Sequence, residues 1–441
     1  MSKLKFIDLF AGCGGLSLGL SLAGLEGQFA IERDAMAFET FEENFLATRD
    51  LPIARFAWPQ WLARQPWSID ELLDNHGVEV AGLAHQIDVL AGGPPCQGFS
   101  FAGKRQETDP RNQLFEKYAQ VVDTIRPRVL VLENVPGMRV AHSSPDTPGG
   151  GRAKAGESFY DKLRKKLEAM GYEVHGQVLD ASRYGVPQKR SRLIVIGLEK
   201  QLAGRLDGGP RRVFELMEEQ RATQLRELGL GETITARDAI SDLEVEGAAR
   251  KPCADPQSRG PFEEAVYKEP LTPYQRLMHG ACSSDAMDSM RLARHSAEVR
   301  DRFAAILDEC RRGVRLDQAS RERHGLKKHR VYPMASDQPA PTITTLPDDV
   351  LHYAEPRILT VRESARLQGF PDWFRFRGRF TTGGHRRTKE CPRYTQVGNA
   401  VPPYLGRAIG LAITAAIEEA AGSPARVPAK PGPGQLEIAF T

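Results

Sequence analysis

Three segments of the sequence carry side chains that could do covalent chemistry. Cys96 stands in GGPPCQGFS, directly after the apolar run IDVLAGG, and the two prolines before it leave the loop little freedom. Glu133 ends another apolar run, VLVLEN, where a buried strand has no structural use for an acid. Arg190 and Arg192, in QKRSR, directly precede a third run, LIVIG. A thiol, a carboxyl group and a guanidinium at one place can act as nucleophile, proton donor and anion binder.

The elements that must position these groups are strands that alternate with helices over residues 4–200. KFIDLF, GQFAIERD, IDVLAGG and RVLVLENV read as buried strands, NQLFEKYAQVVDTI has one apolar helical face, and EVHGQVLDA and RLIVIGL predict a closing pair of strands. This alternation predicts the α/β fold class, with a doubly wound, mainly parallel sheet. Open α/β sheets do their chemistry at the carboxyl ends of the strands, where Cys96 and Glu133 would lie. A lone cysteine is more often an inert packing residue, so the role of Cys96 depends on the other groups at that edge.

The organisation of the chain changes after residue 204. GRLDGGPRR, RKPCADPQSRGPF and DQPAPTITTLPDD are rich in turn-forming residues, and regular periodicity returns in LTVRESARLQGF and PYLGRAIGLAITAAIEEA. The sequence therefore predicts a catalytic and cofactor-binding domain over 1–204, a loop-rich second lobe over 205–355, a return to the first domain over 356–420 and a flexible tail over 421–441.

Composition favours a globular protein of the cytoplasm. The 441 residues are 41% hydrophobic and 27% charged, which exceeds one ordinary core and makes two lobes the expectation. We find no apolar run of membrane-spanning length and no signal-peptide pattern. The six cysteines form no CxxC pair and no His cluster has zinc spacing, so we expect no disulfide framework and no metal. The net charge of +3 neither demands nor excludes nucleic acid.

A glycine-rich turn at the start of the chain predicts a nucleotide site. It runs from Phe10 to Gly15, follows a strand and opens a helix, where glycines let a ligand approach the backbone. Glu32 ends the next strand, about twenty residues on, where an acid can hold both ribose hydroxyls. Ser17 stands where a dinucleotide fingerprint needs a third glycine. An adenosine-containing ligand without a pyrophosphate therefore fits better than NAD, although a turn that merely packs closely remains an alternative.

Taken together, these segments resemble the DNA (cytosine-5) methyltransferases of the bacterial modification type. Six sequence blocks stand in that family's order, between residue 6 and about residue 410: DLFAGCGGLSLGL, GGPPCQGFS, LENVPG, QKRSRLIVIG, RESARLQGFP and QVGNAVPP. The resemblance implies a Rossmann-like, S-adenosylmethionine-dependent fold, and it makes residues 205–355 the target-recognition domain. It further implies double-stranded DNA as the partner, bound by a monomer in the bacterial nucleoid.

The resemblance also implies a catalytic role for each reactive group. Cys96 matches the thiolate that adds to C6 of cytosine, so that C5 becomes able to accept a methyl group. Glu133 matches the residue that protonates or hydrogen-bonds N3 and the amino group of the base. Arg192 matches the guanidinium that holds the base carbonyl oxygen, with Arg190 beside it. The target lies inside a duplex, so the base must first be flipped out.

The cofactor-binding residues follow from the same resemblance. S-adenosylmethionine would lie across the glycine turn, with its ribose on Glu32, next to a leucine and below the QVGNAVPP block. The expected contacts are Phe10, Ala11, Gly12, Gly14, Gly15, Glu32, Leu114 and Asn399. One departure concerns the adenine amino group: the tryptophan-rich segment 54–70 offers no matching acid, since neither Ser68 nor Asp70 aligns, and this contact stays unassigned.

Two basic stretches, 311–330 and 375–393, could contact DNA phosphates, with a solvated surface as the alternative for each. Three other functions compete with DNA methylation. A tRNA cytosine-5 methyltransferase would share the fold, and a non-catalytic DNA-binding relative would typically lack the nucleophile or the acid, both of which stand here. A nicotinamide dehydrogenase lacks its glycine at position 17 and leaves Cys96 unexplained.

The last residues contain a second possible partner site. After a spacer rich in proline and glycine, the segment QLEIAF resembles peptides that bind the bacterial replication sliding clamp. The matching residues are Gln435, Leu436, Ile438 and Phe440. An incidental tail is the alternative, because a six-residue match is a weak signal.

Overall fold

The structure is a computed structural model that describes residues 3–94, 113–140, 157–280, 282, 287–382, 386 and 389–422. Cys96, the tail segment from Gln435 to Phe440, and parts of the basic stretch 375–393 lie outside the described residues. What the sequence predicts for Cys96 and the tail segment therefore stays a prediction.

A six-stranded sheet forms the centre of the large domain, in the order β2-β1-β3-β4-β6-β5. The strands are β1 (Lys5–Leu9), β2 (Glu26–Ile31), β3 (Val89–Gly92), β4 (Val129–Asn134), β5 (Tyr172–Asp180) and β6 (Ser191–Glu199). Strands β2, β1, β3 and β4 pair in parallel, whereas β6 runs antiparallel to both β4 and β5. The predicted α/β fold with a mainly parallel sheet is confirmed, including its closing pair of strands.

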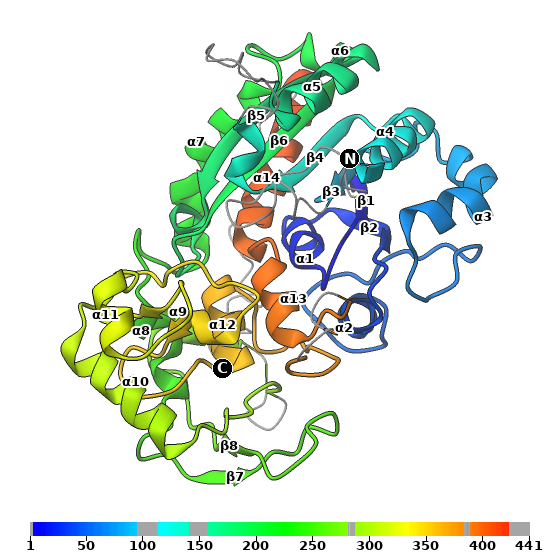
Figure 1. Cartoon of the computed structure of the whole chain (residues 1–441). Coiled ribbons are helices and arrows are strands. Elements are labelled where there is room, and N and C mark those ends of the chain that lie inside the picture. Colours follow the sequence, from blue (N-terminus) through cyan, green and yellow to red (C-terminus); the bar gives the residue numbers. More distant parts are fainter. Residues whose placement is uncertain are drawn as a thin grey trace, which may run out of the picture.

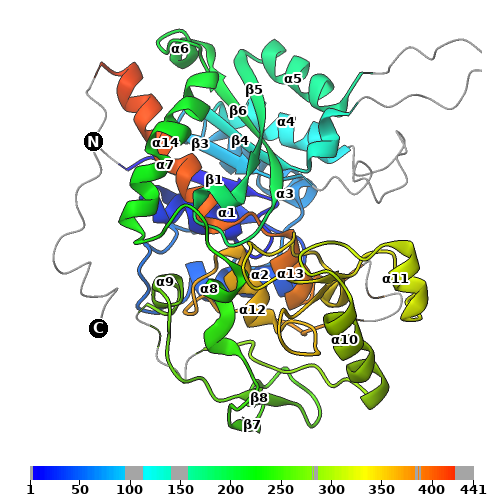
Figure 2. The same cartoon turned by 90° about the vertical axis from the view of Figure 1, so that its left-hand side faces the viewer.

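Helices cover both faces of this sheet (Figures 1 and 2). Alternate residues of a strand point to opposite faces, so Phe6 packs in one core and Ile7 in the other. The first face carries α1 (Gly15–Leu22), α7 (Arg211–Glu227) and α14 (Pro403–Ala420), with α2 (Ala35–Phe45) beside them. The second carries α3 (Ile69–Ala81), α4 (Gln113–Ile125) and α5 (Phe159–Ala169), and the short α6 (Lys200–Ala203) follows β6.

Helix α14 returns from the far end of the sequence to lie against α1. A Cβ at Gly19 would lie 2.4 Å from the Pro403 carbonyl oxygen, and one at Gly410 would lie 2.6 Å from the Ala23 Cβ. Glycine is therefore what allows the two backbones to approach so closely. The stretch Arg393–Ala420 is the one described stretch with the length and composition of a membrane span, but 78% of its apolar window is buried inside the protein. Its packing identifies it as core.

The second lobe is loop-rich, as the sequence predicts. It contains α8 (Ala236–Ile240), β7 (Arg250–Pro252), β8 (Glu263–Ala265), α9 (Pro273–His279), α10 (Ala297–Glu309), α11 (Gln318–Arg323), β9 (Tyr332–Pro333) and β10 (Val350–Leu351). Part of it has a core of its own, made of Ile306, Leu307, Leu316, Val331, Leu351 and Ile358. Helix α7 follows the predicted boundary at residue 204 but lies with α14 on the sheet (Figure 2). The domain boundaries themselves stay predictions.

Helix α12 (Val361–Gln368) lies between the lobes with all of its residues buried, charged ones included. Arg366 forms ion pairs with Asp242 of the second lobe at 3.0 Å and with Asp372 at 2.7 Å. Glu363 pairs with Arg357 at 2.7 Å. Buried charges are tolerated only when they are paired, so these contacts define how α12 sits between the two lobes. The helix α13 (Arg393–Asn399) then leads into α14.

Asp8 fixes the first helix to the first strand. This carboxyl group lies in β1, is 2% exposed, and accepts a 2.6 Å hydrogen bond from the Ser17 hydroxyl of α1. Ser17 replaces the third glycine of a dinucleotide fingerprint, and its hydroxyl makes this bond. Burial is the main cause that raises the pKa of Asp8 to about 7, and the nearby charge of Glu32 adds to it.

The raised pKa of Asp8 predicts how stability depends on pH. Between the ordinary value of 3.8 and about 7, the folded protein binds one proton more than the unfolded chain, so stability falls as pH rises through this window. Asp8→Asn removes the titration and keeps an acceptor for Ser17. From pH 5 to pH 8 we expect the wild type to lose on the order of 3 kcal/mol relative to this variant. Urea unfolding of both proteins measures the difference, and parallel pH profiles would contradict it.

Candidate active site

The turn between β1 and α1 has an unusual backbone. Phe10, Gly12 and Gly14 have positive φ angles of 61°, 58° and 94°. Such an angle is uncommon for phenylalanine, and strained positions of this kind cluster at functional sites. A Cβ at Gly12 would meet nothing within 4 Å, so a ligand could approach the backbone there. The Ala11 N–H donates to the Ile31 carbonyl at 3.0 Å, which joins the turn to the end of β2.

Gly14 and Gly15 have a packing reason to be glycine. A Cβ at Gly14 would lie 2.4 Å from the Phe45 ring of α2. One at Gly15 would lie 2.3 Å from the carbonyl oxygen of Val401, which follows α13. The start of α1 is therefore pressed between α2 and the chain that returns from the second lobe. Cofactor contacts by these two glycines stay predictions.

Glu32 is held in place by the backbone. One carboxylate oxygen accepts the Gly12 N–H at 2.9 Å, and the other accepts the Asp34 N–H at 2.7 Å. Burial raises the pKa of this carboxyl group. Each oxygen of a carboxylate has a further lone pair, so Glu32 could still accept both hydroxyls of a ribose. The open backbone at Gly12 and the fixed acid at Glu32 together fit an adenosine.

The other two predicted cofactor residues lie at different places. Leu114 is partly buried in the first turn of α4, where it packs on the core of the second sheet face. Asn399 is exposed and ends α13, two residues before the Val401 carbonyl that abuts Gly15. Helix α13, which Asn399 ends, also contacts the glycine turn directly. The Cys13 thiol of the turn donates to the carbonyl of Gln396, which lies 383 residues later in the sequence.

The tryptophan-rich segment follows the edge strand β2. The backbone N–H of Trp67 donates to the Glu32 carbonyl at 2.9 Å. The Trp61 ring packs edge-on against the Phe29 ring, with 5.6 Å between the ring centroids. The segment therefore reaches the same strand end as the predicted ribose site. Sequence reasoning did not foresee this placement. It noted that the segment is rich in tryptophan, but composition does not show which strand these side chains contact.

Ser68 and Asp70, the two residues that the family pattern left unmatched, have structural partners. The Ser68 hydroxyl accepts the Glu71 N–H in a capping box at the start of α3. Asp70 forms an ion pair with Lys117 of α4 at 3.0 Å. These contacts account for both side chains without an adenine ligand.

Glu133 and Arg192 form an ion pair at the sheet edge. Arg192 Nε lies 2.6 Å from Glu133 Oε1, and the two side chains are 14% and 13% exposed. Glu133 near the end of β4 is opposite Ile194 in the register of β6. Because β6 is antiparallel to β4, its first residues lie at the edge where β4 ends. The sequence prediction that brings this acid and this guanidinium together is thus met in the geometry, while their catalytic roles stay predictions.

The chain that leads to Cys96 starts beside this ion pair. A Cβ at Gly93 would lie 3.5 Å from Glu133 Oε2, and the Asn134 side-chain amide donates to the Pro94 carbonyl at 3.3 Å. Both contacts place the end of β3 against the end of β4. Cys96 itself lies outside the described residues.

Arg190 lies in the interior and not beside Glu133. Its side chain is fully buried, and its guanidinium donates to the carbonyl oxygens of Ile343, Gly398 and Ala400 at 3.0, 2.8 and 3.0 Å. Desolvation, followed by the neighbouring charge of Arg192, lowers the pKa of Arg190 well below its usual value. Its predicted contact with the base stays a prediction, and the contacts that it makes are those of a positioning residue.

The two basic stretches differ in how free their cations are. In 311–330, four cationic side chains are exposed and form no ion pair with a described residue: Arg311, Arg315, Arg323 and Lys327. In 375–393, four described arginines are paired: Arg375 and Arg377 with Glu43, Arg379 with Glu390, and Arg393 with Asp255. Arg386 and Lys389 of this stretch are exposed and form no ion pair with a described residue. Both stretches therefore offer exposed cations for phosphate contacts, and the first offers more of them.

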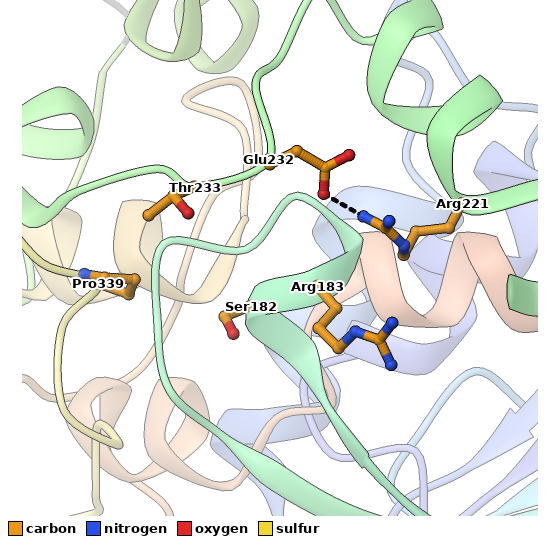
Figure 3. A pocket seen from close by; sticks show the side chains of 6 residues that line it. All are labelled: Ser182, Arg183, Arg221, Glu232, Thr233 and Pro339. Carbon is orange, nitrogen blue, oxygen red and sulfur yellow. Dashed lines mark hydrogen bonds and ion pairs between the residues drawn. The ribbon is translucent and has the colours of Figure 1, made fainter.

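A small polar cavity lies where the lobes meet, at the turn that follows β5. It has a volume of about 320 Å³ and is lined by Ser182, Arg183, Arg221, Glu232, Thr233 and Pro339. Arg221 forms an ion pair with Glu232 (Figure 3). Arg183 pairs with Glu218 at 2.7 Å. Both cations already have carboxylate partners, so the cavity offers little charge to an anion.

Asp8 is a site residue that sequence reasoning missed. It lies under the glycine turn, and the signal was present: an acid inside the apolar run KFIDLF is as unusual as Glu133 in VLVLEN. Among the described residues, no group of three His, Cys, Asp or Glu side chains could hold a metal ion.

Comparisons with known proteins place this geometry in one family. The model of the family "C-5 cytosine-specific DNA methylase" matches residues 4–415. The type II methyltransferase M.DdeI of Desulfomicrobium norvegicum is 30% identical over 424 residues, which cover 92% of this chain and 87% of the relative. The type II methyltransferase M.XorII of Xanthomonas oryzae pv. oryzae is 30% identical over 458 residues, covering 100% and 92%.

A solved structure agrees with these relatives. It is a prophage-encoded DNA modification methyltransferase of E. coli, with a TM-score of 0.58 and 25% identity, and the match covers 92% of this chain and 97% of that structure. The chain therefore belongs to the C-5 cytosine-specific DNA methylase family and is a DNA cytosine-5 methyltransferase of the restriction–modification type, with S-adenosylmethionine as its methyl donor.

Proposed function

We propose that this methyltransferase acts on a cytosine flipped out of a specific duplex sequence, through a transient bond between Cys96 Sγ and C6 of the base. The observation that carries the proposal is the Glu133–Arg192 pair, 2.6 Å apart at the edge where β3 leads into the Cys96 loop. Two peptide units separate Pro94 from Cys96, and they reach at most about 7.6 Å. That reach is short enough for one base to meet all three side chains.

The proposed chemistry makes an unreactive carbon nucleophilic. The Cys96 thiolate adds to C6, the ring π electrons move toward C5, and N3 takes a proton from Glu133. Arg192 holds the base carbonyl oxygen, which orients the ring. S-adenosylmethionine supplies an electrophilic methyl group, whose bond to sulfur breaks as the bond to C5 forms. Transfer of the C5 proton to a solvent water molecule then releases the Cys96 sulfur with its bonding electrons, and N3 returns its proton to Glu133.

Residues of the chain also account for cofactor and DNA binding in this proposal. Gly12 gives the cofactor access to the backbone, Glu32 accepts the ribose hydroxyls, and Leu114 and Asn399 would contact the cofactor from α4 and from the end of α13. The lobe over 205–355 reads the DNA sequence, and the exposed cations of 311–330 contact phosphates. Flipping a base costs a few kcal/mol, which these phosphate contacts offset. A protein that binds the chromosome in this way is expected at the nucleoid.

A mechanism-based inhibitor tests the covalent step. Bisulfite sequencing of DNA from a host that expresses the protein first maps the target, and an oligonucleotide with 5-fluorocytosine at that position is then incubated with enzyme and S-adenosylmethionine. The fluorine cannot leave as a proton does, so we expect a denaturant-resistant adduct that peptide mass spectrometry locates at Cys96.

Cys96→Ser is the matched control for this experiment. It should form no adduct and yet bind the cofactor, whose predicted contacts come from other strands. Normal methylation without an adduct would refute the proposal. Transfer of labelled methyl groups to tRNA and not to duplex DNA would favour the rival substrate.

Variants of the ion pair test the roles of Glu133 and Arg192. Glu133→Gln removes the proton donor, and Arg192→Met removes the group that holds the base, so each should lower kcat by about 10²–10⁴-fold. Cofactor affinity should change little, because Glu32 and Gly12 lie on other elements. Glu199→Gln, at the opposite end of β6, serves as the control and should keep wild-type turnover. Unchanged kcat in Glu133→Gln would refute the assignment.

We further propose that the tail recruits the enzyme to the replication sliding clamp, which would direct methylation to new DNA. The support is the sequence QLEIAF alone, with apolar residues in a polar, proline-rich tail. Purified clamp should retain the full chain but not a chain truncated after residue 430, nor one with Leu436→Ala and Phe440→Ala together. Equal retention of all three proteins would refute this partner.

A further inference from the structure

Arg190 is a buried cation without a carboxylate partner. It is 0% exposed, and among the described residues no acid lies within ion-pair distance of its guanidinium. Its Nε has no hydrogen-bond partner in the described part of the chain. Taking a guanidinium out of water costs free energy, so the hydrogen bonds that Arg190 makes inside the protein must offset the lost hydration. Those contacts are the three backbone carbonyls described above.

The three carbonyls belong to two segments far apart in the sequence. Ile343 lies near the end of the second lobe, 153 residues after Arg190. Gly398 and Ala400 lie at the end of α13, 208 and 210 residues after it. The last carbonyls of a helix lack partners within the helix, and a cation is favoured at that end. Arg190 thus caps α13 and ties it to the second lobe with one planar group.

The residues just before β6, which include Arg190, are joined to residues 340–343 by several other hydrogen bonds. The Lys189 N–H donates to the Ala340 carbonyl at 2.8 Å, and the Ala340 N–H donates to the Pro187 carbonyl at 2.9 Å. The Gln188 side chain accepts the Ile343 N–H at 2.8 Å and donates to the Leu367 carbonyl of α12 at 3.1 Å. These bonds form one buried polar network around the guanidinium.

This network contacts both the Glu133–Arg192 pair and the cofactor turn. On one side, Arg192 follows Arg190 by two residues, lies in β6 and pairs with Glu133 at 2.6 Å. On the other side, a Cβ at Gly15 would lie 2.3 Å from the Val401 carbonyl and 3.2 Å from the Ala400 Cβ. The residues capped by Arg190 therefore press directly on the start of α1, next to the open turn at Gly12.

We propose that Arg190 is a positioning residue whose guanidinium sets the end of α13 against the start of β6, and so fixes the cofactor turn relative to the Glu133–Arg192 pair. The part that concerns methyl transfer rests on the proposed function, whereas the part that concerns cofactor affinity does not. A planar guanidinium can donate to three carbonyls at once in a fixed geometry, and a lysine ammonium cannot reproduce that fork.

Two variants act on this contact from opposite sides. Arg190→Lys keeps the charge and loses the planar donor set. Gly398→Ala keeps Arg190 but moves the end of α13, because a Cβ there would lie 2.3 Å from the Thr344 carbonyl oxygen. Arg362→Lys is the control, since Arg362 is equally buried and also donates to backbone carbonyls, of Pro371 and Phe374. Its hydrogen bonds to described residues reach neither α13 nor the cofactor turn, and its ion pair with Asp288 makes it the better neutralised of the two arginines.

The primary measurement is the Kd of S-adenosylmethionine without DNA, by calorimetry on the full chain. We expect at least a tenfold rise for Arg190→Lys and for Gly398→Ala, and less than the product of the two effects in the double variant, because both act on one contact. At saturating cofactor and DNA, kcat should also fall in both. For Arg362→Lys, the melting temperature should fall while the Kd stays within twofold of wild type.

The inference is overturned if Arg190→Lys lowers the melting temperature as Arg362→Lys does but leaves the Kd within twofold of wild type. A double variant whose effects multiply fully would also overturn it. Should Arg190→Lys fail to fold, the Kd of Gly398→Ala decides the question. If the wild type binds the cofactor but leaves cytosine unmethylated, the proposed function fails, and the Kd comparison still decides the role of Arg190.

Discussion

The direction of β6 is the constraint on which the active site depends. Four neighbouring strands run in parallel, and β6 runs against β4 and β5, so its first residues arrive at the edge where the other strands end. An arginine just inside the beginning of a strand can therefore meet an acid near the end of its neighbour. A parallel β6 would carry Arg192 to the opposite edge of the sheet, away from Glu133. The antiparallel pairing of β6 with β4 is therefore what brings Arg192 and Glu133 together as an ion pair.

A second constraint comes from the chain that returns after the second lobe. It lies so close to the first helix that only glycine fits at Gly15 and Gly19, where a side chain would strike the backbone of residues 401 and 403. The cofactor turn is thus formed by residues near the start of the chain and is covered by residues 400–403 near its end. These contacts close the first domain on itself after the second lobe, and they let the buried network around Arg190 act on the cofactor turn.

Sequence reasoning predicted the sheet, the helix alternation and the meeting of Glu133 with Arg192, because apolar periodicity and an acid in an apolar run are local signals. It named Arg190 as the neighbour of Arg192, and that role stays a prediction. It did not foresee that the Arg190 guanidinium donates to carbonyls of residues about 150 to 210 positions away. A motif specifies the residue type, but long-range packing decides which way its side chain turns. The Asp8–Ser17 bond was within reach of the same argument that identified Glu133. The placement of the tryptophan-rich segment along β2 was not, because it depends on an edge strand that only the folded sheet defines.

The buried ion pairs of α12 have a consequence for heat tolerance. Water solvates ions less favourably as temperature rises, so the penalty for removing Arg366, Asp242 and Asp372 from water shrinks on warming, while apolar stabilisation per unit area levels off. The joint between the lobes is thus built from the kind of contact that weakens least in hot solution. The ion pair between Arg366 and Asp242, which joins α12 to the second lobe, should therefore keep its place as the temperature rises.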